Sequence, residues 1–113
     1  MHDNRIDKFE TFRDLVQAEF KDSVGCFEMF FGPKESDEHG SATVSIDPSA
    51  FKSDNAEGIL KEALTRLHFD AEMTEVDSKE EYAYAELPES SGFTLLWVTP
   101  ARYGWISLMV TIN

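Results

Sequence analysis

The spacing of apolar residues follows a helical period at the start of this 113-residue chain. In residues 4 to 22, apolar side chains recur every three or four positions and share one face at 3.6 residues per turn. The apolar positions are Ile6, Phe9, Phe12, Val16 and Phe20. Arg13 falls inside the same arc, and we expect its stem to pack along the seam with the guanidinium in water. The pattern predicts a helix that buries one stripe.

The period changes to two after Val24, which is typical of strands. Phe27, Met29 and Phe31 alternate with Cys26, Glu28 and Phe30 until Gly32 and Pro33 interrupt the pattern. Residues 42 to 46 alternate in the same way, so we expect a hairpin with a polar loop over residues 32 to 41. Cys26 is expected to be a small buried residue of the first strand.

A second helix is expected to begin at Asp54, whose side chain can cap the amide of Glu57. Its apolar stripe would be Leu60, Ala63, Leu64 and Leu67, and Gly58 lowers its helix propensity. Beyond His68 the alternation predicts four strands, over residues 71 to 76, 81 to 87, 93 to 99 and 105 to 112.

These elements define one α+β domain over residues 1–113, in the order α-β-β-α-β-β-β-β. Short connections favour antiparallel neighbours, so we expect a mostly antiparallel sheet of about six strands. Two helices cover only one face of such a sheet. The opposite face must meet water or a partner.

Charge is distributed unevenly along the chain. Twenty-two Asp and Glu against ten Lys and Arg give a formal net charge of −12, more than the magnitude of about 2–8 that keeps a small domain soluble. Residues 70 to 89 contain Lys79 as their only base and the following acids: Asp70, Glu72, Glu75, Asp77, Glu80, Glu81, Glu86 and Glu89. Residues 90 to 113 contain no acid. We therefore expect the last hairpin in the middle of the sheet and the acidic hairpin nearer an edge.

The outer face of this sheet is expected to carry aromatic side chains. Small residues fit beneath a helix, so Ala83 and Ala85 are assigned to the core and Tyr82 and Tyr84 to the other side. The tyrosines would then share the outer face with Phe30, Trp105 and Met109. Two alternatives remain open: a loop or terminus covers this face, or a register shift of one residue exchanges the faces.

No motif in the sequence specifies a catalytic site. Residues Glu35 to Gly40, with the sequence ESDEHG, match the start of a calcium loop, but Ile46 stands where the bidentate glutamate belongs. The histidines, His2, His39 and His68, are far apart in sequence. We expect no catalytic residue, metal site or cofactor, although weak cation binding at Glu35 to His39 stays open.

The composition also bears on compartment and partners. The absence of a long apolar run and the single cysteine indicate a cytoplasmic protein without a membrane partner. Strong acidity opposes direct binding of nucleic acid and attracts basic proteins.

The sequence thus favours a non-enzymatic inhibitor of the immunity, antitoxin or phage anti-defence type. It would bind a basic, nucleic-acid-handling partner such as a nuclease and imitate nucleic acid. The expected binding residues are Asp70, Glu72, Glu75, Asp77, Glu80, Glu81, Tyr82, Tyr84, Glu86, Glu89 and Trp105. Alternatives are a homodimeric chaperone-like or assembly module that uses the same face, a small cation-binding domain or enzyme, and acidity that reflects a salty cytoplasm.

Overall fold

The computed structural model describes residues 4–31, 40–77, 82–100 and 104–112, and for residues 4 and 72–77 it describes the backbone alone. Two helices, α1 (Asn4–Phe20) and α2 (Ala56–Arg66), lie against an antiparallel sheet, which confirms the α+β class. The strands are β1 (Val24–Phe31), β2 (Gly40–Ile46), β3 (Glu72–Asp77), β4 (Tyr82–Glu86), β5 (Leu95–Pro100) and β6 (Ile106–Ile112). The sequence did not predict three short 3-10 helices: Lys21–Ser23, Pro48–Ala50 and Glu89–Ser91.

The strand order is β1-β2-β6-β5-β4-β3, with β1 and β3 at the two edges. The acid-free hairpin β5–β6 therefore lies in the middle of the sheet, and the acidic segment supplies the edge strand β3 with its neighbour β4, as expected. A central strand is flanked on both sides by other strands, so it favours the apolar residues that β5 and β6 contain.

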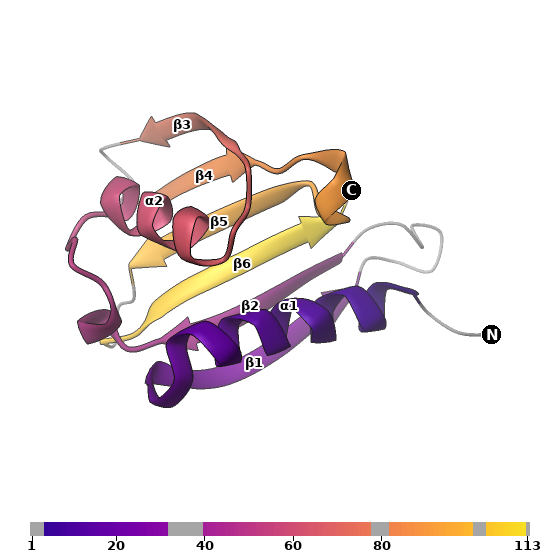
Figure 1. Ribbon diagram of the computed structural model, residues 1–113, viewed down its shortest axis with the longest axis horizontal. Helices are drawn as coiled ribbons and strands as arrows, with labels where there is room; N and C mark the ends of the chain where they lie inside the picture. The colour runs from indigo at the N-terminus through magenta and orange to yellow at the C-terminus, as the bar shows by residue number, and fades with distance from the viewer. Residues whose placement is uncertain (1–3, 32–39, 78–81, 101–103, 113) are drawn as a thin grey trace.

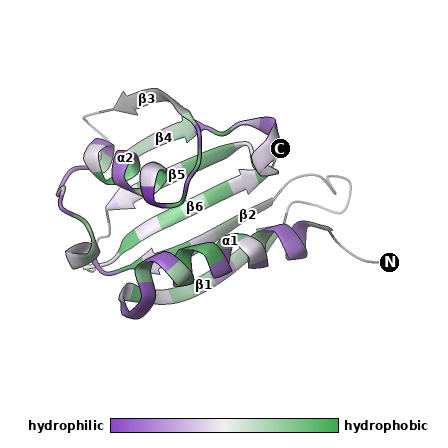
Figure 2. Cartoon of the chain, in the orientation of Figure 1, coloured by the Kyte–Doolittle hydropathy of each residue, from purple (hydrophilic) through white to green (hydrophobic). Residues whose placement is uncertain are grey.

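Both helices cover the same face of the sheet (Figure 1). α1 packs on β1 and β2, while α2 packs on β4 and β5. Figure 2 shows the apolar side of α1 turned toward the sheet and apolar positions along β5 and β6. Alternate residues of β2, β4, β5 and β6 enter this core: Ala42, Val44, Ile46, Ala83, Ala85, Leu96, Val98, Ile106, Leu108 and Val110. The alanines of β4 lie beneath α2, as the sequence predicted.

The stripe of α1 is buried at Phe9, Phe12, Val16 and Phe20. The helix ends two residues earlier than expected, because Lys21 adopts a positive φ of 49° and cannot continue a right-handed helix. Arg13 keeps its guanidinium at the surface, 5.5 Å from the ring centroid of Phe27.

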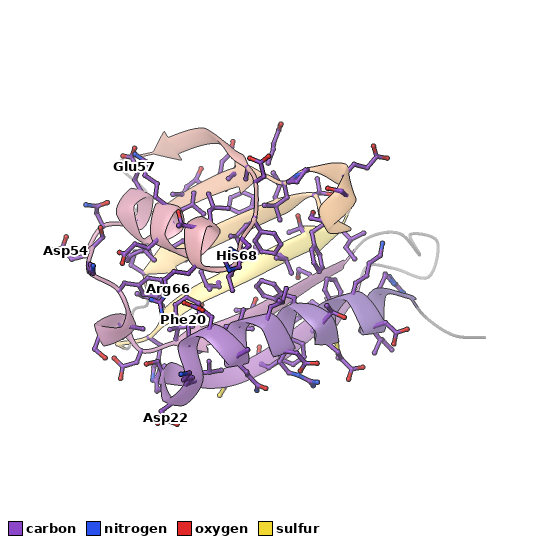
Figure 3. All side chains as sticks on the ribbon, in the orientation of Figure 1. Phe20, Asp22, Asp54, Glu57, Arg66 and His68 are labelled. Carbon is purple, nitrogen blue, oxygen red and sulfur yellow. The ribbon has the colours of Figure 1, made fainter. Side chains whose placement is uncertain are left out.

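The start of α2 differs from the predicted cap. Asn55, not Asp54, is the N-cap residue, and its side-chain oxygen accepts a hydrogen bond of 2.8 Å from the amide of Gly58. Asp54 lies in the loop before the helix (Figure 3). Both residue types cap well, so the sequence could not distinguish two adjacent candidates. The stripe contains Ile59 in addition to the expected leucines and Ala63.

Arg66 joins the two helices. Its Nε donates to Glu19 Oε1 of α1 at 2.8 Å, and its Nη1 donates to the carbonyl of Ala50 at 2.7 Å. The guanidinium also lies 4.2 Å from the ring centroid of Phe20, toward which it points in Figure 3. This one side chain therefore ties α1, α2 and the segment between β2 and α2 together.

Cys26 is exposed, which corrects the expectation that it is buried. The register of β1 against β2 is irregular between Val24 and Phe27, where a bulge shifts the alternation. In addition, β1 is an edge strand and its outer side has no helix over it. A cysteine on this side of an edge strand therefore meets solvent.

Candidate functional site

The candidate site is the sheet face opposite the helices, called here the outer face. Register pairs run straight across it, from Tyr84 on β4 to Trp97, Met109, Thr43 and finally Glu28 on β1. Residues paired in register share a face of an antiparallel sheet. The residues of this row are half-buried or exposed, whereas their neighbours along each strand enter the core.

Three rings at one side of the outer face contact one another. Tyr84 and Trp97 lie with ring centroids 4.5 Å apart, Tyr82 and Trp97 lie 5.7 Å apart, and the two tyrosines stack at 6.2 Å with an interplanar angle of 11°. These separations are typical of favourable aromatic pairs. We call Tyr82, Tyr84 and Trp97 the Tyr–Trp cluster, and all three side chains are half-buried.

Trp97 is the centre of this cluster, and the sequence analysis missed it. The signal was present: Leu96 and Val98 enter the core, so Trp97 must point to the outer face. Its indole Nε1 is buried without a hydrogen-bond partner in the described part of the molecule. Such a donor is uncommon in native proteins, because a buried unpaired polar group costs about 1–3 kcal/mol.

The middle of the outer face is lined with small hydroxyl side chains. Ser41, Thr43 and Ser45 on β2 pair in register with Thr111, Met109 and Ser107 on β6. This strip separates the Tyr–Trp cluster on β4 and β5 from the residues on β1. The outer face is therefore not one continuous aromatic surface.

Trp105 lies beyond this strip and apart from the tyrosines, which corrects the expectation of one shared aromatic patch. Its ring covers Gly25 of β1, where a Cβ atom would come within 2.9 Å of Trp105 Cζ3. Four strand spacings of about 4.8 Å separate β1 from β4, or roughly 19 Å. Trp105 and Phe30 are both well exposed, at 43% and 54%.

Of the exposed acidic side chains, Glu86 is the one that the structure places beside the Tyr–Trp cluster, two residues beyond Tyr84 on β4. Asp70 and Glu89 are also exposed, in the segments before β3 and after β4. The backbone positions of Glu72, Glu75 and Asp77 on β3 are in register with Glu86, Tyr84 and Tyr82. The side chains of residues 72–77 and the whole of Glu80 and Glu81 lie outside the described structure.

An open depression of about 650 Å³ borders the same end of β4 and β5. Its apolar lining includes Leu87, Phe93 and Ile112, while Glu86 and Glu89 contribute carboxylates and Lys8 an ammonium group. Apolar surface beside carboxylates suits a side chain with an apolar stem and a cationic end.

Among the side chains that the structure describes, two carboxyl groups have clearly shifted pKa values, and both bind backbone amides of their own chain. The backbone amide of Ser49 donates to Asp47 at 3.0 Å and lowers the pKa of this carboxyl. The backbone amide of Lys52, with that of Ser53, donates to Glu62 and likewise lowers its pKa. Neither group lies on the outer face.

No cluster of three His, Cys, Asp or Glu side chains suited to a metal ion occurs in the described ranges. His68 is exposed, and His2, His39 and the segment from Glu35 to His39 lie outside those ranges. Of the helices that the structure describes, none combines the length and apolar character needed to cross a membrane.

The fold and the site define a class: an acidic α+β protein whose two described helices leave one sheet face free, and this face carries a half-buried aromatic cluster. Comparison with known proteins adds no relative, since no protein-family model, curated protein or solved structure matches this chain.

Proposed function

We propose that the protein is a non-enzymatic binding protein that recognises a basic partner protein through the Tyr–Trp cluster and the carboxylates beside it. The observation that supports this most directly is the Tyr84–Trp97 pair, which lies half-buried on a sheet face without a helix over it. Tyr and Trp are the residue types that most often dominate binding energy at protein interfaces.

The expected partner is basic because Glu86 and the acid-rich strand β3 lie beside the cluster. Exposed carboxylates at Glu86, Glu89 and Asp70 attract Lys and Arg side chains, and the protein's net charge of −12 steers approach over a longer range. A nuclease or another nucleic-acid-binding protein has such a surface. In this proposal the acidic hairpin occupies the groove that would otherwise hold nucleic acid, so the protein acts as an inhibitor of the immunity or anti-defence type.

The rings and the charges have different roles in this proposal. Charges at the rim mainly raise the association rate, and they weaken as salt rises. The rings provide the apolar contact that slows dissociation once water is excluded.

Affinity capture from the native host and its phage tests the proposal. Immobilised protein is compared with a Tyr84→Ala variant, and each captured protein is purified and titrated against the soluble chain. We expect a basic protein whose binding is lost in Tyr84→Ala. Its association rate should fall at least tenfold between about 0.01 M and 0.15 M salt, where the Debye length falls from about 30 to about 8 Å.

Trp105→Ala is the matched control, since Trp105 is an outer-face aromatic residue that lies apart from the cluster. It should retain binding. A captured partner that binds Tyr84→Ala as well as wild type, or whose association rate does not respond to salt, refutes the proposal.

A further inference from the structure

The two edges of the sheet differ in how they are protected against pairing with another strand. Edge strands in native proteins are usually guarded by charges, proline or short length. β3 has three acids within six residues. β1 has eight residues, no proline and one charged residue, Glu28. From Phe27 to Phe31 its register is regular, so this half is a straight, unguarded edge.

The same half of β1 exposes aromatic side chains. Phe30 is 54% exposed on the outer face, and Phe31 is 42% exposed on the helix side. Phe31 contacts the ring of Phe9, with centroids 6.1 Å apart, and has the guanidinium of Arg5 above it at 4.7 Å. These residues extend the core to the edge of the sheet, where β1 pairs with β2 on one side and with no described strand on the other.

We propose that β1 pairs with β1 of a second copy of this chain, which gives a two-fold dimer with a continuous sheet of twelve strands. An antiparallel strand pair is self-complementary about a two-fold axis, as a symmetric dimer requires. Centring the axis on Met29 places Phe27 opposite the partner's Phe31. It also places Glu28 opposite the partner's Phe30, so the only charge of the strand does not face its own copy.

The charge distribution favours a second copy at this edge. The acid-rich strand β3 lies five strand spacings from β1, or roughly 24 Å, and the Debye length is about 8 Å at physiological salt. The two acidic hairpins would therefore occupy opposite ends of the dimer without repelling each other. On the helix side, the guanidinium of Arg13 is already paired with Asp14 at 3.1 Å and with Glu10 at 3.6 Å, so no unpaired cation enters the interface there.

The dimer would present two binding surfaces on one side. Register partners share a face, so both Tyr–Trp clusters would lie on the same surface of the twelve-stranded sheet. Seven strand spacings separate Trp97 from the partner's Trp97, or roughly 34 Å in a flat sheet. The dimer does not depend on the function proposed above, but it would make that function bivalent.

Sedimentation velocity over low to high micromolar concentration tests the dimer. We expect a monomer–dimer equilibrium for wild type and a monomer for Phe30→Glu, which sets new carboxylates opposite Glu28. Leu15→Glu is the control: Leu15 is 42% exposed on the flank of α1 away from Arg13, and its variant should still dimerise. A monomeric wild type, growth beyond a dimer, or a dimer that Tyr84→Glu abolishes and Phe30→Glu leaves intact would overturn the proposal.

Disulfide formation tests the register. In a Cys26→Ser background, Met29→Cys should oxidise readily to a covalent dimer, because residues on the axis of an antiparallel pair have Cα atoms about 4.5–5.5 Å apart. The natural Cys26 lies three residues from the axis, or roughly 20 Å from its copy, and should not crosslink. Crosslinking of Cys26 but not of Met29→Cys refutes this register.

Discussion

Tyr84 and Trp97 occupy one register pair of β4 and β5, and their ring centroids lie 4.5 Å apart on the uncovered face of the sheet. This contact joins two segments of different charge. β4 belongs to the acidic segment, residues 70 to 89, and β5 to the segment without acids, residues 90 to 113. The contact also brings Tyr82 into the same cluster. The aromatic pair therefore stabilises the pairing of β4, next to the acidic edge strand, with β5 in the middle of the sheet.

A double-mutant cycle should detect this coupling. We expect Tyr84→Leu and Trp97→Leu each to lower the free energy of unfolding, and the pair to show an interaction energy of about 0.5–1.5 kcal/mol. Urea denaturation of the four proteins measures it. A parallel cycle between Tyr84 and Trp105, which are not neighbours, should be additive. Additive effects in the first cycle would show that each ring stabilises the protein only through the apolar surface it buries, without a specific contact energy between the two rings.

The cap of α2 gives a second prediction. Asn55 Oδ1 accepts a hydrogen bond from the amide of Gly58, so Asn55→Ala should cost about 1 kcal/mol of stability. Asp54→Ala should change the free energy of unfolding by less than about 0.5 kcal/mol. Thermal or urea denaturation of both variants checks this. The reverse ranking would support the cap expected from the sequence.

The free energy of unfolding should depend on pH through the carboxylate of Glu62. Its pKa is lowered from the ordinary value of 4.5, chiefly because the amide of Lys52 donates to the carboxylate. A lowered pKa in the folded state means that the ionised group stabilises the fold above pH 4.5, and that this stabilisation is lost as the pH falls below it. We expect Glu62→Gln to cost about 1 kcal/mol at pH 7 and progressively less toward pH 3.

Urea denaturation of wild type and Glu62→Gln across this pH range measures the difference. Glu57→Gln is the control, since the Glu57 carboxylate pairs with Lys61 at the surface at 3.3 Å. Its smaller effect should disappear in high salt. A Glu62→Gln deficit that stays constant down to pH 3 would contradict the assigned role of the carboxylate.

Local periodicity was sufficient to predict two helices, six strands and the buried side of β4. The alternation that placed Ala83 in the core also placed Tyr82 on the outer face, and the charge gradient along the chain located β3 at an edge. Three features of the structure did not follow from this pattern. Cys26 is exposed because it lies on the outer side of the edge strand β1, Trp105 turns toward Gly25 instead of the tyrosines, and Asn55 is chosen over Asp54 by backbone geometry. Each depends on the path of the backbone or on neighbours distant in sequence, which periodicity does not encode.

Gly58 provides the last prediction. Replacing glycine by alanine inside a helix usually gains about 1 kcal/mol. Here a Cβ on Gly58 would collide with Ser53 Oγ and come within 2.6 Å of Ser53 Cβ, so we expect Gly58→Ala to destabilise the protein. In a Ser53→Gly background these two atoms are absent and Asn55 Oδ1, at 3.2 Å, is the nearest remaining neighbour of the new Cβ, so we expect the same change to become stabilising. Urea denaturation of the four proteins measures this reversal of sign. A stabilising Gly58→Ala in the wild-type background would mean that the Ser53 loop moves aside at little cost, and that this glycine is not required by packing.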